Sequence, residues 1–102
     1  MKYQLVLQWP TSSIVDYETM LVYEDALVDG LTDCHDVDGH DAGANEVNIF
    51  VHTDDPQLAF IEAKNILKFR EGWPDVRIAY RELASDRYTV LWPEYLKTFV
   101  VA

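Results

Sequence analysis

The chain has 102 residues, a hydrophobic fraction of 49% and a formal net charge of −10. This length and hydrophobic content predict one globular domain over residues 1–102 and exclude a disordered chain. Acidic residues outnumber basic ones by 18 to 8. Binding to nucleic acid or to an anionic membrane is therefore not expected, because both depend on Lys and Arg.

The same features indicate a soluble cytoplasmic protein. Cys34 is the single cysteine, which excludes an internal disulfide, whereas small secreted domains more often carry an even set. Residues 1–10 lack the long apolar core and the cleavage site of a signal peptide. No apolar run approaches the ~18 residues of a membrane span.

Nearly all charged residues in the first two thirds of the chain are acidic. There is no lysine or arginine between Lys2 and Lys64, but there are thirteen Asp and Glu. The acid is densest over residues 33–46. A stretch of one sign creates a field that neighbouring charges do not cancel, so it favours a basic partner or a metal ion.

The first predicted elements are a strand and a helix. Residues 3–9 alternate apolar and polar side chains with a period of two, which predicts a strand with one apolar face. Ser13 followed by Asp16 is a weakened capping box and predicts a helix that starts near Ile14. Gly30 is a plausible stop signal for this helix.

A hairpin and a second helix are predicted next. The acid-rich segment 33–46 is expected to form an edge strand and a turn, and residues 47–52 alternate as a further strand. Asp55-Pro56 combines an N-cap with a proline at the first helical position. This pair predicts a helix from Pro56 to about Arg70.

The last third of the chain predicts two more strands. Residues 76–81 alternate in the same way, and residues 88–92 are expected to form a short fifth strand. Pro93 then begins a short tail.

The order strand, helix, strand, strand, helix, strand resembles the ferredoxin-like split βαβ plait over about residues 2–82. The resemblance implies an α+β fold: a ferredoxin-like βαββαβ two-layer sandwich, here with an added C-terminal strand and a short tail. It also implies the spatial strand order 4-1-3-2 with both helices on one face. It implies no function, because this fold hosts unrelated activities.

Strand alternation assigns side chains to the two faces of this sheet. The face under the helices is expected to hold Tyr3, Leu5, Leu7, Val47, Ile49, Val51, Val76, Ile78 and Tyr80. The other face is expected to show Gln4, Val6, Gln8, Asn48, Phe50, His52, Arg77, Ala79 and Arg81. An antiparallel sheet often leaves one face wet, so this face is either simply solvated or a binding face.

Candidate binding residues lie on this second face. Asp36, Asp38 and His40 alternate along the predicted second strand, so they are expected to share the face at one edge of the sheet. The full predicted binding set is Asp36, Asp38, His40, Asn48, His52, Arg77 and Arg81.

Asp36, Asp38, His40 and His52 are also candidate ligands for a divalent metal ion, because imidazole and carboxylate groups ligate such ions. The spacing matches no strong zinc signature, and Cys34 and Asn45 occupy positions where a calcium loop needs acidic ligands. The alternative is that these charges keep an edge strand from pairing with other sheets.

Two further residues have a chemical and a structural interpretation. Cys34 would be a nucleophile only beside a base, but His35 is expected to point away from it, so a small buried or half-buried cysteine is favoured. Glu24 falls within the apolar stripe of the first helix. It is either a buried carboxylate with a raised pKa or a side chain that snorkels or pairs with an arginine.

The second helix carries an extra apolar set, Leu58, Ile61 and Phe69. Either the apolar tail covers it or it forms a dimer or partner interface. Taken together, these features favour a small interaction protein over an enzyme, such as an inhibitor- or immunity-type partner of a basic protein. The alternative function is a small-ligand or metal-dependent module that uses the open sheet face.

Overall fold

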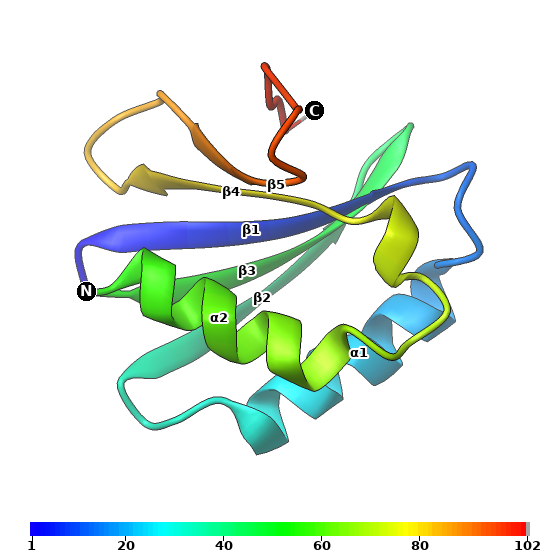
Figure 1. The fold of residues 1–102 in the computed structure, drawn as a ribbon, viewed down its shortest axis with the longest axis horizontal. Helices are drawn as coiled ribbons and strands as arrows, with labels where there is room; N and C mark the ends of the chain where they lie inside the picture. Colours follow the sequence, from blue (N-terminus) through cyan, green and yellow to red (C-terminus); the bar gives the residue numbers. More distant parts are fainter. Residues whose placement is uncertain (102) are drawn as a thin grey trace.

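A computed structural model describes residues 1–101 as one antiparallel sheet of five strands with two α-helices. In chain order the elements are β1 (Tyr3–Pro10), α1 (Tyr17–Gly30), β2 (His35–Ala42), β3 (Glu46–Thr53), α2 (Pro56–Leu67), the 3₁₀ turn η1 (Trp73–Asp75), β4 (Arg77–Glu82) and β5 (Thr89–Trp92). Both helices lie on the same side of the sheet (Figure 1). The predicted α+β class is therefore confirmed.

Neither helix within residues 1–101 has the length and apolar content that a membrane crossing requires.

The strands lie in the order β2-β3-β1-β4-β5, and each neighbouring pair is antiparallel. β1 is central and pairs with β3 on one side and β4 on the other. β2 forms one edge and is joined to β3 by the predicted hairpin. β5, the predicted added strand, forms the other edge.

The helix starts follow from their capping residues. The carboxylate of Asp16 accepts a hydrogen bond from the backbone N–H of Thr19 at 2.8 Å, so α1 begins at Tyr17. The predicted start near Ile14 with Ser13 as the cap is wrong: the Ser13 hydroxyl accepts from the backbone N–H of Val15 and donates to Asp75, both outside the helix.

The second helix starts as predicted. The Asp55 carboxylate accepts from the backbone N–H of Leu58 at 3.1 Å, and Pro56 occupies the first turn. α2 ends at Leu67, before the expected Arg70.

The core lies between the sheet and the two helices. All of the predicted inward residues except Tyr3 belong to this core or pack against it. Trp9 is fully buried, and its indole Nε1 donates to the backbone carbonyl of Gly72 at 3.0 Å. Gly72 lies close enough to Val15 that an added Cβ would sit 2.2 Å from the Val15 Cγ2 atom.

The centre of the opposite face of the sheet is covered, which corrects the prediction of an open face. Val6, Asn48 and Ala79 are 0% exposed, and Gln8 is 2% exposed. Alternation correctly identified residues that share this face, but it carried no information about what covers them.

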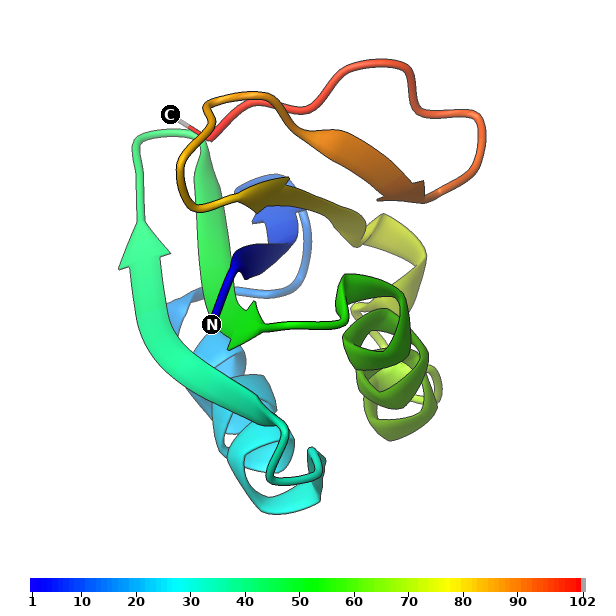
Figure 2. The same cartoon turned by 90° about the vertical axis from the view of Figure 1, so that its left-hand side faces the viewer.

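The C-terminal segment, residues 98–101, returns across this face (Figure 2). The Val100 carbonyl accepts a hydrogen bond from Gln8 Nε2 at 2.9 Å. The Phe99 ring lies 5.0 Å from the ring of Tyr88. The tail therefore covers the sheet and not α2.

The extra apolar set of α2 stays exposed, so the predicted cover by the tail is wrong. Leu58, Ile61 and Phe69 are 40%, 52% and 90% exposed. Trp92 of β5 does reach α2, where its ring lies 6.2 Å from that of Phe60. This contact leaves the outer face of the helix free within residues 1–101.

Candidate functional site

The charge asymmetry of the sequence is also an asymmetry in space. Residues 3–53, here called the acidic half, form β1, α1, β2 and β3 and contain ten Asp and Glu but no Lys or Arg. β2, β3 and β1 are consecutive in the sheet. α1 packs against β2 and β3, whereas α2 packs against β1 and β3 (Figure 2). The exposed carboxylates of this half are Asp16, Glu18, Asp25, Asp29, Asp33, Asp36, Asp38 and Asp41.

The outer face of α1 combines acidic and apolar side chains. Glu18, Val22, Asp25 and Asp29 are all exposed and are separated by four, three and four positions. That spacing puts them on one face of a helix. Val22 is 52% exposed, so this acidic face has an apolar centre.

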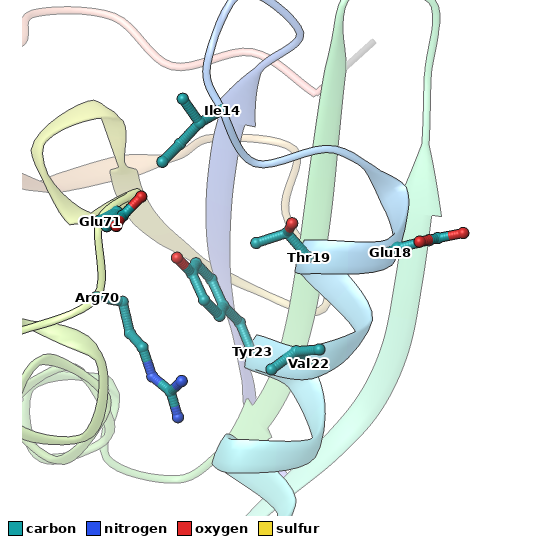
Figure 3. Close-up of a pocket in the computed structure, with 7 residues that line it drawn as sticks. All are labelled: Ile14, Glu18, Thr19, Val22, Tyr23, Arg70 and Glu71. Carbon is teal, nitrogen blue, oxygen red and sulfur yellow. The ribbon is translucent and has the colours of Figure 1, made fainter.

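A groove of about 560 Å³ lies beside this face, between α1 and the segment after α2. Tyr23 projects from α1 toward Arg70 and Glu71 (Figure 3). The Tyr23 hydroxyl accepts a hydrogen bond from the backbone N–H of Gly72 at 3.2 Å, which ties the two walls together. The exposed side chain of Ile14 lines the same groove.

A β-bulge separates the residues that were predicted to share one face of β2. The register with β3 shifts between Val37 and Gly39, and Gly39 has a φ of +146°, a conformation that glycine adopts readily. Because a shift of one residue reverses the side-chain direction, His40 faces the helices. The prediction that Asp36, Asp38 and His40 share one face is therefore wrong.

His40 makes contacts with α1. Its Nδ1 lies 3.0 Å from Glu24 Oε2, and its Nε2 lies 3.3 Å from the Tyr17 hydroxyl. Of the alternatives for Glu24, a side-chain pair is the nearer one, but the partner is the imidazole of His40 and not an arginine.

Asp38 and His52 do meet on the other face. His52 Nε2 lies 3.5 Å from Asp38 Oδ2, and Asp36 is directly opposite His52 in the strand register. These three residues remain together, whereas His40 is separated from them by the sheet.

Asn48 belongs to a buried polar network that sequence reasoning missed. Gln8 Nε2 donates to Glu46 Oε2 at 2.7 Å and to Asn48 Oδ1 at 3.0 Å, and Asn48 Nδ2 donates to Glu46 Oε2 at 3.0 Å. Glu46 is only 7% exposed. Its position next to the hairpin turn gave no signal of burial.

Arg77 and Arg81, the two arginines of the predicted binding set, lie on β4, which is not an edge strand because β5 lies outside it. Arg81 donates from one guanidinium nitrogen to the carbonyls of Glu82, Leu83 and Ser85, so it ties down the β4–β5 turn. Within residues 1–101 the buried Nε of Arg77 has no hydrogen-bond partner.

Cys34 is exposed, and the expectation of a buried or half-buried cysteine is wrong. Its Sγ lies 3.4 Å from Nε2 of His35, because the chain turns just before β2 and is not extended there. Glu62 Oε2 lies 3.1 Å from the same ring nitrogen. Sequence reasoning missed this cluster, since Glu62 is 27 positions from His35.

Thr32 fixes the charge of Glu62. The backbone N–H of Thr32 donates to Glu62 Oε1 at 2.9 Å, and the Thr32 hydroxyl donates to both carboxylate oxygens. These bonds, with a smaller contribution from His35, hold the pKa of Glu62 below its ordinary value. The carboxylate is therefore ionised at neutral pH.

A scan against protein-family models, a search of curated proteins and a search of solved structures each found no match to this chain.

Proposed function

We propose that this chain is a small cytoplasmic protein-binding domain whose acidic half binds a basic surface of a partner protein, as inhibitor- and immunity-type proteins do. The observation that carries this proposal is the set of eight exposed carboxylates on α1, on β2 and on the residues just before each of them, in a half of the chain that has no lysine or arginine. Complementary charge across an interface speeds association and excludes wrong partners.

The outer face of α1 is the proposed centre of the interface. Protein interfaces commonly have an apolar centre within a polar rim. Val22 and Ile14 supply exposed apolar surface next to the groove, and Asp25 and Asp29 supply negative charge beside it. The fitting partner presents an apolar side chain to the groove and Lys or Arg to the two aspartates.

We also infer that the fold is a ferredoxin-like plait with an added edge strand. The neighbour order β2-β3-β1-β4 and the position of both helices on one side of the sheet support this assignment. The assignment concerns architecture, and the proposed binding function does not depend on it.

Salt dependence tests the binding proposal. The immobilised protein is expected to capture a basic protein from an extract of the source cells at 50 mM salt. Capture should fall steeply by about 300 mM, because mobile ions screen exposed charges. A charge-neutral partner, a partner retained equally at both salt concentrations, or capture of only a second copy of this chain would contradict the proposal.

A further inference from the structure

Cys34, His35 and Glu62 bring a thiol, an imidazole and a carboxylate together at the start of β2. Their Sγ, Nε2 and carboxylate oxygen atoms all lie within 4.8 Å of one another. The side chain of His35 is completely buried, that of Glu62 is 19% exposed, and Cys34 is on the surface. Three different ligand types thus meet at a point that solvent reaches from the cysteine side.

The arrangement around His35 is that of a ligand and not of a catalytic relay. In a relay the nucleophile and the acid contact opposite nitrogens of the imidazole. Here Cys34 and Glu62 both approach Nε2, at 3.4 and 3.1 Å. The other nitrogen, Nδ1, lies 2.8 Å from the hydroxyl of Thr53.

This second contact is the kind that orients metal-binding histidines. A ligating imidazole usually donates its other N–H to an outer partner, which fixes the ring and leaves one nitrogen free for the metal. The Thr53 hydroxyl oxygen is held in turn by the backbone N–H of Asp55 at 2.9 Å. Thr32 holds the Glu62 carboxylate in the same way.

The spacing is close to that of a tetrahedral site. Zinc bonds of ~2.3 Å to sulfur and ~2.0–2.1 Å to nitrogen and oxygen put neighbouring ligand atoms about 3.3–3.6 Å apart. The observed separations at Nε2 are 3.4 Å to sulfur and 3.1 Å to oxygen. Only a small movement of exposed Cys34 is needed to complete the three-ligand arrangement.

We propose that Cys34, His35 and Glu62 bind a zinc-class divalent cation, with the fourth position open to water or to a donor from a partner. Thiolate and imidazole ligands select zinc over magnesium and calcium, which prefer oxygen ligands. The site joins β2 to α2 and is separate from the predicted set of Asp36, Asp38, His40 and His52.

Metal titration of the purified full chain tests the site. One Zn²⁺ is expected to bind per chain and to raise Tm, and Mg²⁺ at the same concentration should have no effect. Co²⁺, a spectroscopic substitute for zinc, should give a thiolate-to-cobalt charge-transfer band, because the site contains Cys34. Absence of zinc binding, or a cobalt complex without that band, would overturn the proposal.

Two variants test the ligands, and a third serves as the control. Cys34→Ser and Glu62→Gln replace each ligand with a side chain of similar shape. Neither residue is fully buried, so both variants are expected to fold. Each should weaken zinc binding by more than the roughly 10–100-fold that loss of an outer partner costs. The matched control Glu94→Gln makes the same chemical change at an exposed glutamate of the C-terminal tail and should leave zinc affinity unchanged. Unchanged affinity in Cys34→Ser, or an equal loss in Glu94→Gln, would contradict the assignment.

Discussion

Trp9→Ala is expected to lower the free energy of unfolding by about 3–5 kcal/mol, the usual cost of deleting a buried tryptophan side chain. Trp9 is fully buried in the central strand, and its ring lies 5.6 Å from that of Tyr23. Its indole N–H also holds Gly72, and Gly72 in turn bonds to Tyr23. The substitution therefore removes core volume and loosens the wall of the groove beside α1.

Trp9→Phe separates these two effects. It keeps an aromatic ring in the core but leaves the Gly72 carbonyl without its indole donor, so a loss of about 1–3 kcal/mol is expected. Urea denaturation followed by far-ultraviolet circular dichroism measures both variants without relying on tryptophan fluorescence. Domains are typically stable by only ~5–15 kcal/mol, so the expected loss is a large share of the total. A loss below about 1 kcal/mol for Trp9→Ala would contradict the claim that packing of the Trp9 ring stabilises the core.

Gln8→Leu is the second substitution with a large expected effect. Leucine fills a similar volume, but it removes the amide that donates to the Glu46 carboxylate at 2.7 Å and to the Val100 carbonyl at 2.9 Å. Hydrogen bonds to charged groups contribute about 1.5–3 kcal/mol. We expect a loss in that range, measured by the same denaturation experiment, together with faster hydrogen exchange in residues 98–101.

Gln4→Leu is the matched control. Gln4 lies on the same face of the same strand, but it is half-buried and makes no side-chain hydrogen bond within residues 1–101. Its replacement should change stability by less than about 0.5 kcal/mol. Equal losses in the two variants would show that the polar network around Gln8 does not hold the C-terminal segment in place.

Local patterns predicted the elements well, because the forces behind them are local. Alternation in residues 3–9 and 47–52 reflects strands that turn an apolar face toward the helices, and the structure has Leu5, Leu7 and Ile49 in the core. Asp55-Pro56 marked the start of α2 because a cap and a fixed φ act within one helical turn.

The candidate sites were predicted less well, because they depend on contacts between distant segments. The bulge at Gly39 reversed His40, and a single glycine among polar residues did not distinguish a bulge from a turn. The tail is apolar enough to cover either α2 or the sheet, and its position on the sheet depends on contacts with distant residues, such as the hydrogen bond to Gln8. The meeting of His35 with Glu62 likewise depends on how α2 packs against the sheet and α1.

A matched pair of charge variants tests the proposed binding surface most directly. One triple variant, Asp25→Asn, Asp29→Asn and Asp36→Asn, neutralises exposed residues of the acidic half. The other, Glu82→Gln, Asp86→Asn and Glu94→Gln, neutralises exposed residues at and after the end of β4. Each removes three negative charges from a chain of net charge −10, so effects of total charge are equal in both.

The measurement is the affinity of each triple variant for the captured basic partner at 50 mM salt. Each exposed ion pair contributes about 0.2–1 kcal/mol, and 1.4 kcal/mol corresponds to a tenfold change. The acidic-half variant should therefore bind about tenfold more weakly than the unaltered protein, and the control should bind within about twofold of it. Equal weakening of both variants, or weakening of the control alone, would contradict the claim that the acidic half is the binding surface.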